Sequence, residues 1–194
     1  MDQKTVGFAF TGSFCTLDRA LDTLRTAVER YAEVIPIVSE RVASTDTRFG
    51  TASEFLAEVE RLCGRPPIAT VAAAEPIGPK KLLDVLIVCP CTGNTLAKLA
   101  AGVTDSAVTM AVKAHLRNAR PVVLAVSSND ALAAGAKNVA ALLDRKHCFF
   151  VPFRQDDPAG KPASLVAEFS LVCDAADAAA RGEQLQPLLL GAKK

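Results

Sequence analysis

Apolar residues along the chain fall into two alternating patterns, and the first consists of short, nearly continuous runs. The runs are TVGFAF (5–10), EVIPIV (33–38), LLDVLIVC (82–89), PVVLAV (121–126) and HCFFVP (147–152). Uninterrupted apolar runs of this length are typical of strands whose two faces are both buried, as in a parallel sheet. The pattern therefore predicts five parallel strands.

The second pattern fills the segments between these runs, where apolar residues recur at steps of three or four. The sets are Leu17, Leu21, Leu24, Val28 and Tyr31; Phe55, Leu56, Val59 and Leu62; Val108, Val112 and Leu116; Leu132, Ala136, Val139 and Leu143; and Leu165, Phe169, Val172 and Ala176. This spacing is typical of amphipathic helices that cover a sheet. Strands and helices are thus expected to alternate along the chain.

Such alternation, with right-handed crossovers, predicts an α/β fold: a three-layer, doubly wound parallel sheet in one domain over residues 1–194. We expect the flavodoxin-like, Rossmann-type strand order 2-1-3-4-5. Ligands of these sheets bind where the strand order reverses, which here is between the first and third strands. The loops at 11–16 and 90–95 are therefore expected to face each other across a crevice.

Composition excludes several classes of partner. The chain has 22 Lys plus Arg against 21 Asp plus Glu, and no basic block, so nucleic acid is not an expected partner. No apolar run approaches the about 18 residues of a membrane span, and the N-terminal apolar stretch is too short for a secretory signal. We therefore expect a cytoplasmic protein that makes no membrane contact.

Cysteine and histidine usage gives no indication of a metal site. The six cysteines form no CxxC pair, and the two histidines, His115 and His147, are far apart in the sequence. We expect free thiols in a reducing compartment and no bound metal. Cys89 and Cys91 flank Pro90 at a strand end; packing is favoured there over redox chemistry, which stays the alternative.

The first strand leads into FTGSFCTLDRA (10–20), which has the features of a phosphate seat. Gly12 permits close approach of a ligand, the hydroxyls of Ser13 and Thr16 can cap or donate, and the amides of a helix start favour an anion. Neither a P-loop nor a GxGxxG motif is present. The alternative is an ordinary capped helix start.

The third strand leads into PCTGNTLAKLAAGVTD (90–105), whose first residues are small, polar or turn-forming. Thr92, Asn94 and Thr95 can hydrogen-bond a polar heterocycle, Gly93 tolerates positive φ, and Lys98 lies one helical turn beyond Asn94. Without GxGxxG, a flavin mononucleotide (FMN) is favoured over a dinucleotide. A simple strand-to-helix connection is the alternative.

This second segment resembles the PxSANTxAKxAxGxxD signature of the homo-oligomeric flavin-containing cysteine decarboxylase superfamily. The resemblance implies bound FMN, assembly into trimers or their multiples, and a catalytic role for Asn94. The positions that it implies for cofactor binding are Gly12, Ser13, Phe14, Ser39, Cys91, Thr92, Gly93, Asn94, Thr95, Ser127, Ser128 and Asn129. The Gly12–Ser13 turn and Ser39 match that superfamily's phosphate-binding positions.

A longer stretch, from Asn94 to Phe169, together with GFAFTGSFCT near the start and QLQPLLL near the end, resembles the B subunits of bacterial dipicolinate synthases. That resemblance implies oxidation of a dihydrodipicolinate-type precursor to dipicolinate during sporulation, in the mother-cell cytoplasm. It also implies an A subunit that binds NAD(P) and a small dicarboxylate heterocycle as ligand.

Two departures from the decarboxylases weaken a decarboxylase assignment. Residues 39–81 contain no histidine where those enzymes carry a catalytic one, and the fourth-strand loop reads VSSND (126–130) instead of PAMN. Three functions stay open: a flavin-type oxidoreductase subunit, a non-redox docking partner with a vestigial cofactor crevice, and a free-standing decarboxylase.

A planar dicarboxylate substrate requires cationic groups for its two carboxylates. The candidates are Arg48, Lys98, Lys113 and Arg154, each with the alternative of a solvated surface cation. Arg154 opens RQDDPAGKP (154–162), a segment with two interpretations: a polar surface loop, or an ordered lid or interface segment over the crevice.

Overall fold

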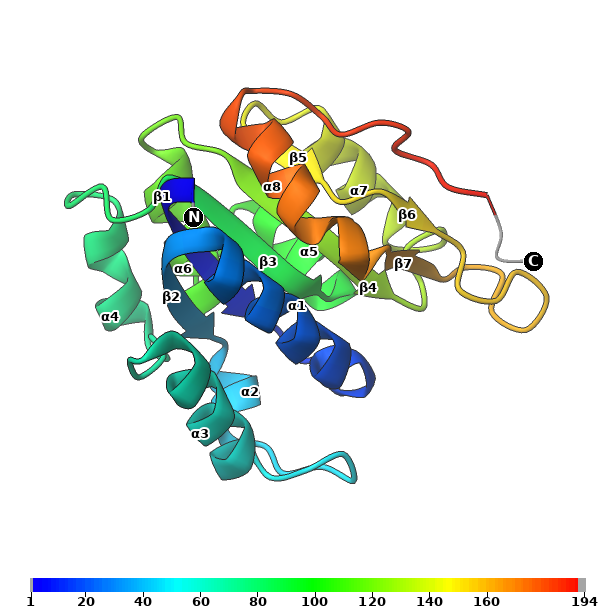
Figure 1. Cartoon of the computed structure of the whole chain (residues 1–194). Coiled ribbons are helices and arrows are strands. Elements are labelled where there is room, and N and C mark those ends of the chain that lie inside the picture. The colour runs from blue at the N-terminus through cyan, green and yellow to red at the C-terminus, as the bar shows by residue number, and fades with distance from the viewer. Residues whose placement is uncertain (1, 192–194) are drawn as a thin grey trace.

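A central sheet lies between two layers of helices in the computed structural model, which describes residues 2–191 (Figure 1). Its parallel strands are β1 (Asp2–Phe10), β2 (Tyr31–Val38), β3 (Val85–Cys91), β4 (Val122–Ser128) and β5 (Cys148–Phe150). They pair in the order β2-β1-β3-β4-β5. The flavodoxin-like α/β fold and the 2-1-3-4-5 order of its parallel strands are confirmed.

The sheet differs from the prediction beyond β4, because it is not purely parallel. Strand β7 (Leu165–Ala167) pairs antiparallel with the end of β4, and β6 (Phe153–Arg154) pairs antiparallel with β7. The helix predicted to begin at Leu165 is therefore wrong in its first turn. Pairing with the backbone of β4 overrides the helical spacing of a short apolar segment.

Helices cover both faces of the sheet (Figure 1). One core contains residues of α1 (Leu17–Arg30), α3 (Ala52–Cys63) and α8 (Val172–Ala180), and the other contains residues of α4 (Val71–Ala74), α5 (Gly93–Ala101), α6 (Ala107–Leu116) and α7 (Ala136–Leu143). Short helical turns complete the chain: η1 (Phe14–Thr16), α2 (Glu40–Ser44), η2 (Glu75–Ile77) and η3 (Phe169–Leu171).

The strand β3 is buried along its whole length, which explains its continuous apolar sequence. It runs through Pro90 and Cys91, two residues that the sequence assigned to the following loop, so α5 begins almost at once, at Gly93. A register shift between Val88 and Cys91 places Cys89 in one core and Cys91 in the other. Burial raises the pKa of both thiols, so the packing interpretation of this pair is confirmed.

His115 is a buried imidazole at the end of α6, with only 1% of its surface exposed. Its Nε2 atom lies 3.1 Å from the carbonyl oxygen of Pro121, which precedes β4. Burial lowers the pKa of His115 from 6.5 to about 4. The neutral ring is therefore part of the packing between α6 and the sheet.

We predict that His115 makes the free energy of unfolding depend on pH between about 6.5 and about 4. The unfolded chain binds the proton more readily in that window, so stability is lost as pH falls, by about 3 kcal/mol in total. Denaturant unfolding of wild type and His115→Gln at several pH values measures this contribution as the difference between the two curves. Parallel curves across the window would contradict it.

Candidate ligand-binding site

A crevice with two cavities opens at the carboxyl ends of β1, β3 and β4. The smaller cavity has a volume of about 650 Å³ and the larger about 930 Å³, both within the range of small-molecule sites. Gly12, Phe14, Thr92 and Asn94 line both cavities and form the boundary between them. The predicted crevice between the loops after the first and third strands is present.

Thr11 joins the two sides of this crevice. Its buried hydroxyl donates to the carbonyl oxygen of Pro90 at 2.7 Å and accepts from the backbone N–H of Thr92 at 3.1 Å. The hydroxyl thereby satisfies two backbone groups that lie just past the last pairing of β1 with β3, at Ala9 and Val88. The position of Thr92, which caps α5, depends on this contact.

Hydroxyl groups continue this connection across the larger cavity to β4. Ser13 Oγ lies 2.9 Å from Ser127 Oγ, and the hydroxyl of Thr16 donates to Ser13 Oγ at 3.0 Å. Both Ser13 and Ser127 were predicted to contact a cofactor. In this structure their hydroxyls also hold the ends of β1 and β4 together.

Gly93 is a glycine for a reason that the sequence did not reveal. It is not among the residues with positive φ, so its tolerance of that conformation is not used here. A Cβ atom at this position would lie 2.7 Å from Ser128 Oγ and 3.0 Å from Asp130 Oδ1. A side chain at this position would therefore require the Ser128 and Asp130 side chains to move away from the first turn of α5.

The crevice is lined by two asparagines, Asn94 and Asn129. Both are exposed, and neither carboxamide has a hydrogen-bond partner within residues 2–191. Asn94 lines both cavities, and Asn129 lines the larger one. A carboxamide without a partner can both donate to and accept from a bound heterocycle.

The smaller cavity contains Ser39 and Thr95 of the predicted set. Ser39 Oγ caps α2 by accepting from the N–H of Val42 at 3.4 Å, and Thr95 Oγ1 lies 3.0 Å from the hydroxyl of Thr92. Lys98 also lines this cavity, although its Nζ is paired with Asp105 at 2.8 Å. Lys98 therefore carries little free charge toward a ligand.

The structure separates the predicted site residues into two groups. Those lining the crevice are Gly12, Ser13, Phe14, Ser39, Thr92, Gly93, Asn94, Thr95, Ser127, Ser128, Asn129, Arg48 and Lys98. Cys91 is fully buried in the sheet, and Lys113 is exposed on α6 away from both cavities. Arg154 lies in β6 and lines neither cavity, and its guanidinium donates to the carboxylate of Glu168 at 3.1 Å.

Sequence reasoning missed three cations of the crevice: Arg41 in the smaller cavity, and Arg19 and Lys161 in the larger one. Arg41 follows Ser39 by two residues, and that proximity to a predicted phosphate position was the available signal. Lys161 belongs to the 154–162 segment, whose residues from Asp156 onward help line the larger cavity. Lys161 and Asp156 of this segment form an exposed ion pair of 3.0 Å, and the lid interpretation stays a prediction beside that of a polar surface loop.

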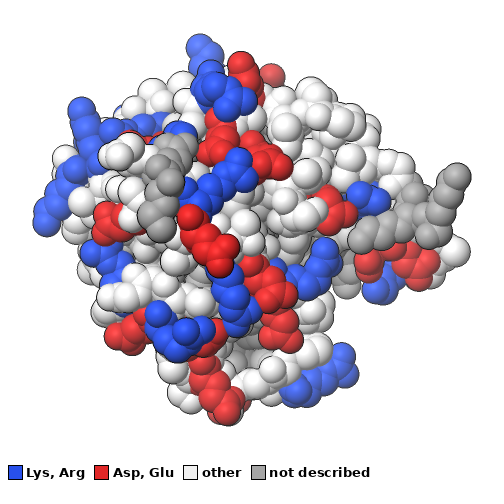
Figure 2. Space-filling view, viewed as in Figure 1, with Lys and Arg blue, Asp and Glu red and all other residues white. Residues whose placement is uncertain are grey.

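Two other kinds of site were sought in the described residues. Within residues 2–191 no group of three His, Cys, Asp or Glu side chains could hold a metal ion, and no helix there is long and apolar enough to cross a membrane. Positive and negative side chains are interspersed on the face shown in Figure 2. That face has no extended patch of one sign.

Comparison with known proteins gives concordant results. The family model described as Flavoprotein matches residues 1–183. The B subunit of dipicolinate synthase from Bacillus subtilis (strain 168) is 45% identical over 187 residues, which are 96% of this chain and 94% of that protein.

Solved structures give the same result. The crystal structure of the dipicolinate synthase B subunit from Bacillus halodurans C is 42% identical, with a TM-score of 0.90 over 98% of this chain and 97% of that one. A dodecameric FMN-dependent UbiX-like decarboxylase from Escherichia coli O157:H7 is 22% identical, with a TM-score of 0.62 over 76% and 79% of the two chains. The last similarity concerns the fold alone.

We predict that Thr11→Val destabilises the chain by about 1–3 kcal/mol, because valine keeps the shape but leaves the Pro90 carbonyl and the Thr92 N–H without their partner. Denaturant unfolding measures the change. Thr26→Val is the matched control, since the Thr26 hydroxyl bonds to Asp22 on the exposed side of α1. Equal effects of the two substitutions would show that the Thr11 hydroxyl does not hold the crevice together.

Proposed function

Because this chain belongs to the flavoprotein family, among its dipicolinate synthase B subunits, we propose that it is the flavin-binding subunit of a dipicolinate synthase. In this proposal it takes part in oxidising a dihydrodipicolinate-type precursor to dipicolinate during sporulation, in the mother-cell cytoplasm. NAD(P) is bound by a separate A subunit. The observation that carries the proposal is the carboxamide of Asn94, which has no hydrogen-bond partner among the described residues and lies between two cavities of cofactor size.

The smaller cavity fits the phosphate of FMN. The guanidinium of Arg41 has no ion pair within residues 2–191, and the Ser39 hydroxyl accepts one hydrogen bond and still has its proton to donate. The two acids that line this cavity are engaged, since Asp105 pairs with Lys98 and Glu40 accepts from the N terminus of α6. A bound anion would therefore meet the Arg41 cation and the Ser39 hydroxyl, while Lys98 offsets the charge of Asp105 and a backbone N–H engages one oxygen of Glu40.

The flavin ring would lie at the boundary of the two cavities, where Phe14 and Asn94 are placed. Bound FMN supplies a two-electron acceptor. The residues of this chain bind and orient: the Asn94 carboxamide can hydrogen-bond the polar edge of the ring, and Phe14 offers an apolar surface beside it. Asp156 and the residues from Gly160 to Ser164 line the larger cavity, where the substrate would lie.

The proposal treats residues 1–194 as one domain, of which residues 1 and 192–194 lie outside the described part. A single domain is supported by the one central sheet, against each face of which a hydrophobic core is packed. Two alternatives remain: a docking subunit whose crevice takes up no flavin, and an FMN-dependent decarboxylase. The absence of histidine from residues 39–81 disfavours the decarboxylase.

An absorption spectrum of the purified chain, followed by titration with FMN, separates these functions. Flavin bands, together with dipicolinate formation when the A subunit is added, would support the proposal. A colourless chain that takes up no FMN yet still stimulates the A subunit would identify a docking subunit. Release of carbon dioxide from a substrate by the chain alone would identify a decarboxylase.

We predict that Asn94→Asp lowers turnover of the reconstituted two-subunit enzyme at least tenfold, while the melting temperature stays unchanged. The substitution removes a donor and places a negative charge beside an anionic substrate. Asn138→Asp adds the same charge on α7, outside both cavities, and is expected to keep wild-type turnover. Wild-type turnover and FMN affinity in Asn94→Asp would contradict the prediction and would show that residues 90–95 only connect β3 to α5.

We also predict self-association, as in the dodecameric decarboxylase of similar fold. Phe49, with 47% of its surface exposed, lies at the tip of the loop between α2 and α3 and offers apolar area to another subunit. Light scattering at micromolar concentration is expected to give a trimer or a multiple of three 20.4 kDa chains. A strict monomer would contradict this expectation.

A further inference from the structure

Four arginines have a guanidinium group without a hydrogen bond or ion pair among residues 2–191: Arg19, Arg41, Arg48 and Arg117. Three of them line the crevice, while Arg117 lies at the end of α6, away from it. The other arginines of the described chain are bonded to carboxylates or to carbonyl oxygens, as Arg25 and Arg145 are. Among the described arginines, those that lack a protein partner are thus concentrated where a ligand would bind.

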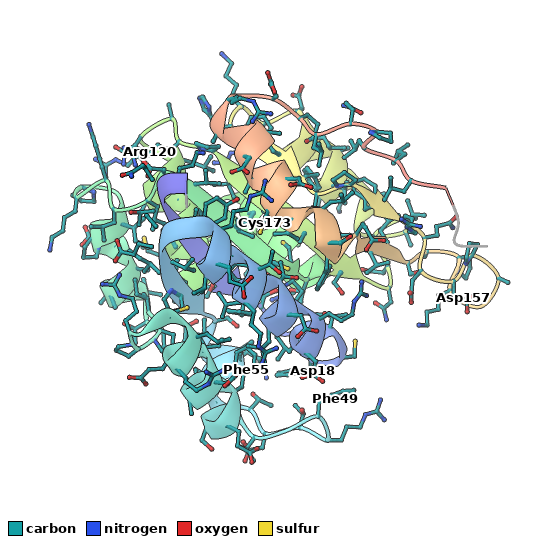
Figure 3. All side chains as sticks on the ribbon, viewed as in Figure 1. Asp18, Phe49, Phe55, Arg120, Asp157 and Cys173 are labelled. Atoms are coloured by element: carbon teal, nitrogen blue, oxygen red, sulfur yellow. The ribbon has the colours of Figure 1, made fainter. Side chains whose placement is uncertain are left out.

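Arg19 and Arg48 share a second feature, because each lies against an aromatic ring. The guanidinium carbon of Arg19 is 4.6 Å from the ring centroid of Phe169, and that of Arg48 is 4.9 Å from the ring centroid of Phe49. Such contacts hold the group without using its in-plane N–H donors. Both arginines line the larger cavity, from α1 and from the loop before α3. Figure 3 shows Phe49 beside the start of α1, which Asp18 marks.

Two acids line this cavity, and among the described residues neither forms an ion pair with Arg19 or Arg48. Asp156 is paired with Lys161 at 3.0 Å, and Asp130 accepts from the hydroxyl of Ser128 at 2.8 Å. The cavity therefore offers two separate guanidinium forks on different structural elements. Each fork is suited to bind a carboxylate through two hydrogen bonds.

We infer that Arg19 and Arg48 form a two-point clamp for the two carboxylates of a planar dicarboxylate, and so determine substrate specificity. The inference rests on the proposed function for the identity of the ligand. The clamp assigns to Arg19 a role that the sequence did not indicate. It also places the substrate in the larger cavity, beside the Phe14 and Asn94 boundary.

Calorimetric titration of the full chain, with and without saturating FMN, tests the clamp with two probes: pyridine-2,6-dicarboxylate and pyridine-2-carboxylate. Wild type is expected to bind the dicarboxylate at least tenfold more tightly than the monocarboxylate. Arg19→Ala and Arg48→Ala should each weaken dicarboxylate binding about tenfold or more and reduce this preference. Arg48→Lys should lie in between, because lysine keeps the charge and loses the fork.

Three controls separate the possible outcomes. Arg117→Ala should leave both affinities unchanged, and the FMN affinity and melting temperature of the two clamp variants should match wild type. The clamp is overturned by unchanged dicarboxylate affinity in both variants, by an equal loss of FMN affinity, or by a wild type that does not bind the dicarboxylate. If wild type does not bind the dicarboxylate but takes up FMN, the clamp is wrong and the flavin proposal stands. If both arginines contribute to dicarboxylate binding and the chain takes up no FMN, the clamp is supported and the flavin proposal is rejected.

Discussion

The hydrogen bonds of the Thr11 side chain are the contact on which the crevice depends. Strand order reverses between β1 and β3, so the chain leaves these neighbouring strands toward opposite faces of the sheet and opens a gap at their ends. Thr11 bonds across that gap to Pro90 and Thr92. Since Thr92 caps α5, the same contact fixes where the helix begins and where Asn94 projects.

The polar groups of the crevice are of two kinds: those that bond to one another and those that have no partner among the described residues. Ser13 and Ser127 bond to each other, and Lys98 bonds to Asp105, so these groups stabilise the walls of the crevice. The carboxamide of Asn94 and the guanidinium of Arg41 have no such partner among the described residues. Polar groups beside a cavity are costly to leave unbonded once water is displaced, so the unpartnered ones indicate where a ligand supplies the bonds.

The sequence predicted the parallel strands and the crevice well, because buried strands and small polar strand ends have strong local signals. It missed β7, whose three residues form a strand through pairing with β4 and β6. The reason for Gly93 was also hidden, since the close contact is with Ser128, 35 positions along the chain. Arg19 belongs to a helix with an ordinary pattern, and only the packed structure shows its side chain facing the larger cavity.

The central claim is that the crevice between β1 and β3 holds a flavin, with the ring beside Asn94. A crystal structure of the chain grown with FMN tests this most directly. The account predicts flavin density at the boundary of the two cavities, with the phosphate near Ser39 and Arg41 and the ring edge within hydrogen-bond distance of the Asn94 carboxamide. Flavin density elsewhere, or a crevice without flavin at saturating FMN, would contradict it.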